Sequence, residues 1–116
     1  RKSPRGMEFA DSNALMKAGA RGPLKQNTTL VAVATNAQLS KLGANRLAQL
    51  SHLGLARTIQ PVNLSSDGDL VVALSVGKLK ADIDVLGVAG AEAVEQAVLR
   101  GVRMAGAAGG LPGLRG

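Results

Sequence analysis

The sequence contains no cysteine, tryptophan or tyrosine, and its one aromatic residue is Phe9. The lack of cysteine excludes disulfides and thiolate metal sites and fits a reducing compartment, so we expect a cytoplasmic protein. No apolar run approaches the ~20 residues that a membrane-spanning helix needs, so we expect no membrane partner. Without large aromatic side chains, the core must be built from Ala, Val, Leu and Ile.

Motifs for metals, cofactors and serine-hydrolase triads are also missing. One histidine, His52, gives poor support for a metal site, and we expect it to be a solvated helix residue. The glycines form neither a Gly-x-Gly-x-x-Gly phosphate loop nor a Walker sequence. There is no Gly-x-Ser-x-Gly elbow that would place His52 in a Ser-His-Asp triad. The sequence therefore predicts neither a cofactor nor a metal.

Charge is spread unevenly along the 116 residues, which carry a formal net charge of +6. Residues 1–27 hold six Lys or Arg against Glu8 and Asp11, whereas residues 28–116 hold eight basic and six acidic residues. A nucleic-acid surface usually combines a basic patch with aromatic stacking partners. Because those aromatic residues are missing, we expect no nucleic-acid partner.

The chain divides into a tail and one α/β unit. Residues 1–27 carry Pro and Gly breakers at both ends, so we interpret them as a linker in which residues 11–18 can form a short helical turn. After the linker, the hydrophobic pattern predicts strand, helix, strand and helix in that order. Their expected ranges are 29–35, 39–58, 70–76 and, after a cap at Asp82 or Asp84, a helix to about residue 104. The Gly-rich residues 106–116 are expected to be loose.

Both predicted strands are apolar on both faces, which is typical of strands buried inside a sheet. Two strands do not make a stable sheet by themselves. We therefore expect this α/β chain to complete a sheet whose other strands lie on another chain or on an earlier part of the same precursor. We also expect Gly43 and Gly54 to let the first helix approach the sheet, and Gly87, Gly90 and Gly101 to be packing positions of the second helix.

The most suggestive segment chemically is the join Gln26-Asn27-Thr28-Thr29, where a polar stretch gives way to an apolar strand. A threonine that heads a buried strand can become a nucleophile if the bond before it is cut, since its hydroxyl then lies beside a free α-amine. That amine has a reference pKa of about 7.7–8.0, which suits a general base at neutral pH. The plainer interpretation is that Thr28 and Thr29, as β-branched residues, simply begin a strand.

A second candidate is the segment Asp67-Gly68-Asp69, directly before the second strand. In an extended segment two aspartates at i and i+2 can point the same way, and close carboxylates couple so that one can retain a proton. Such a pair could orient the amine or hydroxyl of Thr28. The alternative is a hydrophilic Asp-Gly turn. A calcium loop is disfavoured because the next ligand positions are apolar.

These features together resemble the DmpA-type family, also called L-aminopeptidase/D-esterase. The resemblance covers Asn27 to about Met104, and its motifs are Asn27-Thr28-Thr29 with the strand to Ala37, the helix ending Gly54-Leu55-Ala56-Arg57, and Pro61 through Asp67-Gly68-Asp69. Within the family the chain is most similar to hydrolases of 6-aminohexanoate (nylon) oligomers, which have Thr as the nucleophile and Asp at both loop positions. Peptidase relatives commonly use Ser as the nucleophile and a Ser/Glu pair in that loop.

The resemblance implies an N-terminal-nucleophile-like fold of four layers, αββα, to which this chain supplies a strand-helix-strand-helix unit. It implies a precursor that cleaves itself between Asn27 and Thr28, so that residues 1–27 end an α-subunit and residues 28–116 form the β-subunit. Thr28 would be the nucleophile, with Asp67 and Asp69 in supporting roles. The remaining site residues would belong to the α-subunit, and αβ units would assemble into a homo-oligomer.

Three functions stay open at this point. The first is self-processing amide hydrolysis of linear oligomers such as those of 6-aminohexanoate, and the second is aminopeptidase or β-aminopeptidase activity through the same N-terminal Thr. The third, of another class, is a non-catalytic interaction module that docks its helices on a partner. An intact chain would favour the module, whereas a species that starts at Thr28 would favour an enzyme.

Overall fold

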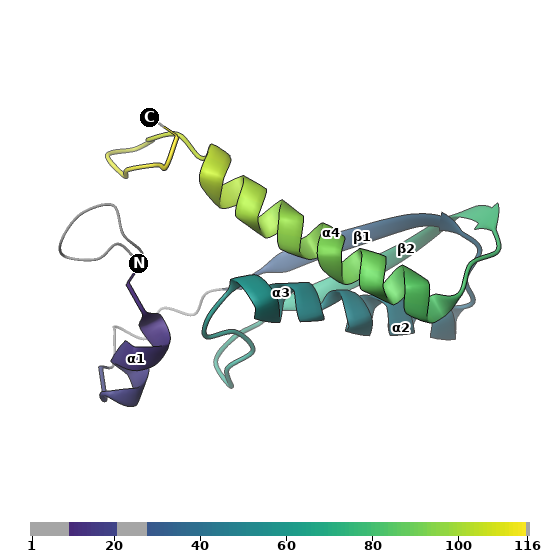
Figure 1. Cartoon of the computed structure of the whole chain (residues 1–116), viewed down its shortest axis with the longest axis horizontal. Coiled ribbons are helices and arrows are strands. Elements are labelled where there is room, and N and C mark those ends of the chain that lie inside the picture. The colour runs from purple at the N-terminus through teal and green to yellow at the C-terminus, as the bar shows by residue number, and fades with distance from the viewer. Residues whose placement is uncertain (1–9, 21–27, 116) are drawn as a thin grey trace.

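The computed structural model describes residues 10–20 and 28–115 (Figure 1). Two parallel strands lie side by side, and three helices cover one face of the pair (Figure 1). The elements are α1 (Ser12–Lys17), β1 (Leu30–Ala37), α2 (Lys41–Ser51), α3 (Leu53–Thr58), β2 (Leu70–Leu79) and α4 (Ile83–Met104). The predicted α/β chain is therefore confirmed, with its strands and helices in the expected order.

The strands pair in parallel, with Leu30 opposite Leu70. A parallel pair needs a crossover connection, which α2 and α3 provide. Both strands run beyond their predicted ends, because pairing resumes after an irregularity with Ala37 opposite Leu79. The parallel register matters for function, since it sets which residues at the two strand entrances become neighbours.

The first predicted helix is divided in two. α2 begins after Ser40, whose hydroxyl oxygen accepts the Gly43 N–H at 3.1 Å and caps the helix. The expectation of one continuous helix over 39–58 is wrong, because the chain turns at His52. There the Leu55 N–H donates to the His52 carbonyl at 3.0 Å, a tighter i to i+3 bond that separates α2 from α3.

The second predicted helix is confirmed as α4, and its N-cap is Asp82 rather than Asp84. The Asp82 carboxylate accepts the N–H groups of Asp84 and Val85 at 2.8 and 3.1 Å, so it satisfies two donors that the helix itself leaves free. α4 then runs to Met104, as predicted. Within its described part, the tail after α4 forms isolated β-bridges, so the expectation of a loose tail is only partly met.

Small residues let the helices approach one another closely. Gly54 of α3 lies against the Ala91 carbonyl of α4, and Gly87 of α4 lies against Leu50 of α2. A Cβ atom on either glycine would meet these neighbours closer than real side chains allow. The prediction that Gly54 permits close packing is confirmed, but its neighbour is α4 and not the sheet.

The other glycines that were expected to pack differ from one another. Gly90 of α4 packs against Ser51 of α2, as expected. Gly43 meets only its own helix start, and Gly101 has no described atom within 4 Å of the position of a Cβ. The packing predictions for Gly43 and Gly101 are therefore wrong, because neither residue faces another described element.

The core lies between the helices and one face of the sheet. Leu55 of α3, Val71 of β2 and Val94 of α4 form its buried centre, and Val31 and Val33 of β1 pack against them. Along both strands these residues alternate with exposed ones, since successive side chains of a strand point to opposite faces. The helices therefore bury one face of the sheet, which we call the covered face.

The other face of the sheet is apolar and exposed in this chain. We call it the bare face, and it consists of Leu30, Ala32, Ala34, Leu70, Val72, Leu74 and Val76. Leu30 and Val76 each keep 73% of their surface exposed. This chain by itself buries one face of its sheet, and burial of both faces in the complete protein stays a prediction. Contiguous apolar surface is common at sites of interaction, so the bare face bears on the proposal made below.

The short helical turn expected within residues 11–18 is confirmed as α1. Asp11 caps it by accepting the Ala14 N–H at 2.9 Å, and Asn13 donates a hydrogen bond to the Gln60 side chain at 3.1 Å. The rest of the predicted linker lies outside the described residues. None of the helices in residues 10–20 and 28–115 combines the length and hydropathy that a membrane span requires.

Candidate active site

The pairing of β1 with β2 brings the two predicted site segments together. Thr28 stands two residues before Leu30, and Gly68 stands two residues before the partner Leu70. The register continues just outside the strands, because the Leu70 N–H donates to the Thr29 carbonyl at 3.0 Å. Thr28 therefore lies beside the Asp67-Gly68-Asp69 segment, although the whole crossover separates the two in sequence.

The Thr28 hydroxyl packs directly against Gly68. A Cβ atom at Gly68 would lie 2.9 Å from Thr28 Oγ1, closer than side chains ordinarily tolerate. The glycine between the two aspartates thus leaves room for the hydroxyl. Thr28 as a whole is exposed in this chain.

Asp69 is held on both sides by backbone donors. Its Oδ1 accepts the Thr29 N–H at 2.8 Å, and its Oδ2 accepts the Asn63 N–H at 3.2 Å. Burial raises the pKa of Asp69, but the hydrogen bonds from Thr29 and Asn63, together with the nearby His52 ring, outweigh burial and bring the pKa below its ordinary value. Asp69 is therefore ionised at neutral pH and fixed next to the residue that follows Thr28.

Asp67 is bound to the same loop. Its Oδ2 accepts the Leu64 N–H at 2.8 Å, while its own N–H donates to the Leu64 carbonyl at 2.9 Å. The two carboxylates thus accept consecutive backbone N–H groups, those of Asn63 and Leu64. Among the described residues, neither carboxylate hydrogen-bonds to the Thr28 hydroxyl. These contacts fit both a supporting role beside Thr28 and the alternative of a hydrophilic turn.

His52 is not the solvated residue that the sequence predicts. It is half-buried where α2 meets α3, and its Nε2 lies 2.7 Å from Asn63 Oδ1. Asn63 has a φ of 57°, in the left-handed region that asparagine tolerates better than most residues. Sequence reasoning did not select Asn63, and its one signal was an asparagine in a polar loop, where turns favour that residue.

The predicted scissile bond between Asn27 and Thr28 falls at a limit of the structure, since Asn27 lies outside the described residues. In residues 10–20 and 28–115, no group of three His, Asp or Glu side chains could hold a metal ion. The groups found near the N-terminal ends of β1 and β2 are a hydroxyl, two carboxylates and a histidine. These groups suit nucleophilic and acid–base chemistry.

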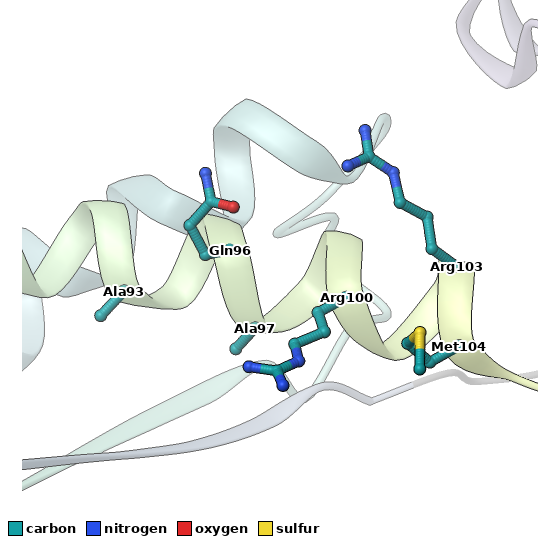
Figure 2. Close-up of a pocket in the computed structure, with 6 residues that line it drawn as sticks. All are labelled: Ala93, Gln96, Ala97, Arg100, Arg103 and Met104. Carbon is teal, nitrogen blue, oxygen red and sulfur yellow. The ribbon is translucent and has the colours of Figure 1, made fainter.

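A shallow depression of about 500 Å³ lies elsewhere, on the surface of α4. It is lined by Ala93, Gln96, Ala97, Arg100, Arg103 and Met104 (Figure 2). Figure 2 shows Arg100 and Arg103 pointing away from one another on either side of the helix. The lining includes neither a carboxylate nor a hydroxyl, so it offers no nucleophile or general base. The candidate catalytic groups therefore lie at the N-terminal ends of the two strands and not in this depression.

The family profile of Peptidase family S58 matches residues 3–115. An uncharacterized aminopeptidase of Mycobacterium tuberculosis is 35% identical over 104 residues, which cover 77% of this chain and 30% of the relative. An uncharacterized aminopeptidase of Mycobacterium leprae is 37% identical over 101 residues, which cover 74% of this chain and 28% of the relative. A 6-aminohexanoate-oligomer endohydrolase of Kocuria sp. (strain KY2) is 29% identical over 90 residues, which cover 66% and 25%. No solved structure matches the chain.

The chain spans less than a third of the length of these curated relatives. The family profile, in contrast, covers nearly all of the chain, including the strand entrances that carry Thr28, Asp67 and Asp69. This coverage supports the resemblance derived from the residues. The chain belongs to peptidase family S58.

Proposed function

We propose that this chain is part of an amide hydrolase that uses Thr28 as an N-terminal nucleophile. The observation that carries the proposal is the contact of the Thr28 hydroxyl with Gly68, between two anchored carboxylates. Membership of peptidase family S58 supports amide-bond hydrolysis, as do the relatives named as aminopeptidases and as a 6-aminohexanoate-oligomer hydrolase.

Self-cleavage of the Asn27–Thr28 bond would leave Thr28 with a free α-amine next to its own hydroxyl. An unperturbed α-amine has a pKa of about 7.7–8.0, so near neutral pH a useful fraction is unprotonated and can accept the hydroxyl proton. Asp69 accepts the Thr29 N–H at 2.8 Å and so fixes the backbone that carries the nucleophile. Asp67 holds the loop whose glycine faces the hydroxyl.

The proposed reaction is acyl transfer in two steps. Thr28 Oγ1 attacks the amide carbonyl carbon while the α-amine takes the hydroxyl proton, and the C–N bond then breaks as the leaving amine accepts that proton. Water, deprotonated by the same α-amine, attacks the resulting ester on Thr28, which releases the acid and restores the hydroxyl. Oxyanion donors would come from the α-subunit, and removing one such donor typically lowers the rate ~10²–10³-fold.

The proposal extends to the bare face of the sheet. An α-subunit from the same precursor would supply the second sheet that packs on Leu30, Val72 and Val76, which gives four layers, αββα. Residues 1–27 would end the α-subunit, residues 28–116 would form the β-subunit, and αβ units would assemble into a homo-oligomer. The exposure of the bare face supports this arrangement, as does the greater length of the relatives.

The proposed substrates are linear amide oligomers such as those of 6-aminohexanoate, because Thr28, Asp67 and Asp69 match the residues of the oligomer hydrolases that the sequence resembles. A second candidate is aminopeptidase activity, which is favoured by the identities of 35% and 37% to the mycobacterial relatives against 29% to the Kocuria hydrolase. A panel of 6-aminohexanoate oligomers, aminoacyl-anilides and β-aminoacyl-anilides distinguishes the two by kcat/KM.

Replacement of Thr28 in the full-length protein tests the proposal. We expect Thr28→Ala to abolish both self-cleavage and amide hydrolysis, whereas Thr28→Ser keeps a hydroxyl and should retain both at a reduced rate. Mass spectrometry detects a species that starts at Thr28, and release of free amine measures hydrolysis. Normal hydrolysis by Thr28→Ala would contradict the proposal, and a parent chain that stays intact would favour the non-catalytic interaction module.

A further inference from the structure

A series of hydrogen bonds links the end of α2 to the candidate active site. His52 Nε2 lies 2.7 Å from Asn63 Oδ1, and the Asn63 N–H donates to Asp69 Oδ2 at 3.2 Å. Asp69 Oδ1 in turn accepts the Thr29 N–H, directly after Thr28. A helix end, a loop and the entrance of β1 are thus connected through side chains.

The direction of the first bond follows from its atoms. An amide oxygen can only accept, so Nε2 of His52 carries a hydrogen and donates it. Both the neutral ring protonated at Nε2 and the imidazolium can make this bond. The bond therefore persists whether or not His52 is charged, and it acts as a constant restraint on Asn63.

Asn63 is a residue for which such a restraint has a purpose. It is exposed, and its φ of 57° lies in a region that residues with a Cβ adopt only at some energetic cost. In this conformation its side chain reaches His52 while its N–H reaches Asp69. A half-buried histidine at a helix end thereby holds an exposed loop residue in the form that binds the carboxylate.

We propose that His52 is a positioning residue, which acts through Asn63 to orient the Asp69 carboxylate beside Thr28. This inference rests on the proposed function, in which Thr28 is the nucleophile. In this role His52 transfers no proton and contacts no substrate. A side chain that presents an N–H at the position of Nε2 should therefore replace it.

The experiment compares His52→Gln with His52→Asn in the full-length protein. The amide nitrogen of Gln can take the position of Nε2, whereas the shorter Asn does not reach Asn63. We expect kcat/KM to fall about tenfold in His52→Asn and to stay within about twofold of the parent in His52→Gln. Gln49→Asn, one turn earlier on α2, is the matched control, because Gln49 bonds Arg46 and not the loop.

A second substitution separates positioning from a general effect on folding. Asn63→Gly keeps the backbone N–H and a favourable positive φ but removes the oxygen that His52 binds, so it should lower kcat/KM about tenfold by itself. In this background His52→Asn should have no further effect, since the two residues act through one bond. Additive losses, or equal losses in His52→Gln and His52→Asn, would overturn the inference.

The outcomes distinguish this inference from the proposed function. An inactive Thr28→Ala variant beside a fully active His52→Asn variant would overturn the role of His52 alone. An active Thr28→Ala variant would overturn the nucleophile, and the role of His52 with it. If His52→Asn does not fold, Asn63→Gly breaks the same bond from the loop side, and an unchanged kcat/KM in that variant overturns the inference.

Discussion

The two faces of the β1–β2 sheet carry similar residue types but have different surroundings. On the covered face, Val31, Val33 and Val71 pack against the helices. On the bare face, Leu30 and Val76 each keep 73% of their surface exposed. Hydrophobicity does not distinguish these faces, because apolar residues predominate on both faces of each strand. The comparison teaches that the chain buries one side of its sheet and presents the other with the composition of a buried side.

The candidate active site lies at the N-terminal ends of β1 and β2, where both faces of the sheet end. Thr28 and Gly68 stand at the entrances of β1 and β2, and both are exposed in this chain. The proposed second layer on the bare face would extend past these strand ends and enclose the site in a cleft. In our proposal, the layer that covers the bare face therefore also completes the active site.

The largest expected effect comes from truncating one residue on each side of the sheet. Leu55→Ala removes a fully buried side chain and should lower the free energy of unfolding by about 3 kcal/mol. Val72 keeps 48% of its surface exposed in this chain, yet we expect Val72→Ala to lose about 2 kcal/mol, because the proposed second sheet covers it. Chemical denaturation of the full-length Thr28→Ala protein, which stays one chain, measures both losses.

The pair of variants can contradict the proposed covering of the bare face. A surface substitution without buried contacts usually changes stability by less than about 0.5 kcal/mol. If Leu55→Ala shows its full loss while Val72→Ala falls in that small range, the bare face is exposed in the whole protein. The four-layer arrangement would then be wrong, although the covered face would remain as described.

A smaller effect, on activity rather than stability, is expected from a substitution at the N-terminal end of β2. Gly68→Ala places a methyl group 2.9 Å from Thr28 Oγ1 and should turn the hydroxyl away. We expect kcat to fall about tenfold with little change in unfolding, since a small misplacement of a reacting group strongly slows reaction. Gly101→Ala in α4 is the matched control, because its methyl group meets no described atom and alanine favours the helix. Full activity in Gly68→Ala would contradict the placement of the nucleophile.

Local patterns predicted the elements well and their contacts poorly. The apolar runs predicted both strands, and Asp82 was one of two expected caps of the helix that ends at Met104. The break at His52 was missed because its sign is one i to i+3 hydrogen bond, from the Leu55 N–H to the His52 carbonyl. A single hydrogen bond of this kind leaves no trace in hydrophobic periodicity.

The candidate site shows the same limit. Thr28 is conspicuous in the sequence because it precedes an apolar strand, and Asp67 and Asp69 because they stand two positions apart just before the next strand. The sequence suggested that the aspartates could orient Thr28, but their contacts depend on the strand register, which the hydrophobic pattern does not give. The bond between His52 and Asn63 was also hidden, because it joins a helix end to a loop residue with a positive φ.

The smallest expected effect is a change in acid stability when Asp69 is replaced. This test concerns the polar N-terminal ends of the two strands and not the apolar faces of the sheet. Burial raises the pKa of Asp69, but the hydrogen bonds from Thr29 and Asn63 and the His52 ring bring it below the ordinary value of 3.8. Because the folded pKa is the lower one, ionised Asp69 contributes stability above the unfolded pKa, and this contribution is lost as the pH falls through the folded pKa. Denaturation at a series of pH values below about 3.8 should therefore show a shallower loss of stability in Asp69→Asn than in the parent. If the free energy of unfolding depends on pH in the same way in the two proteins, these donors do not hold the Asp69 carboxylate in solution.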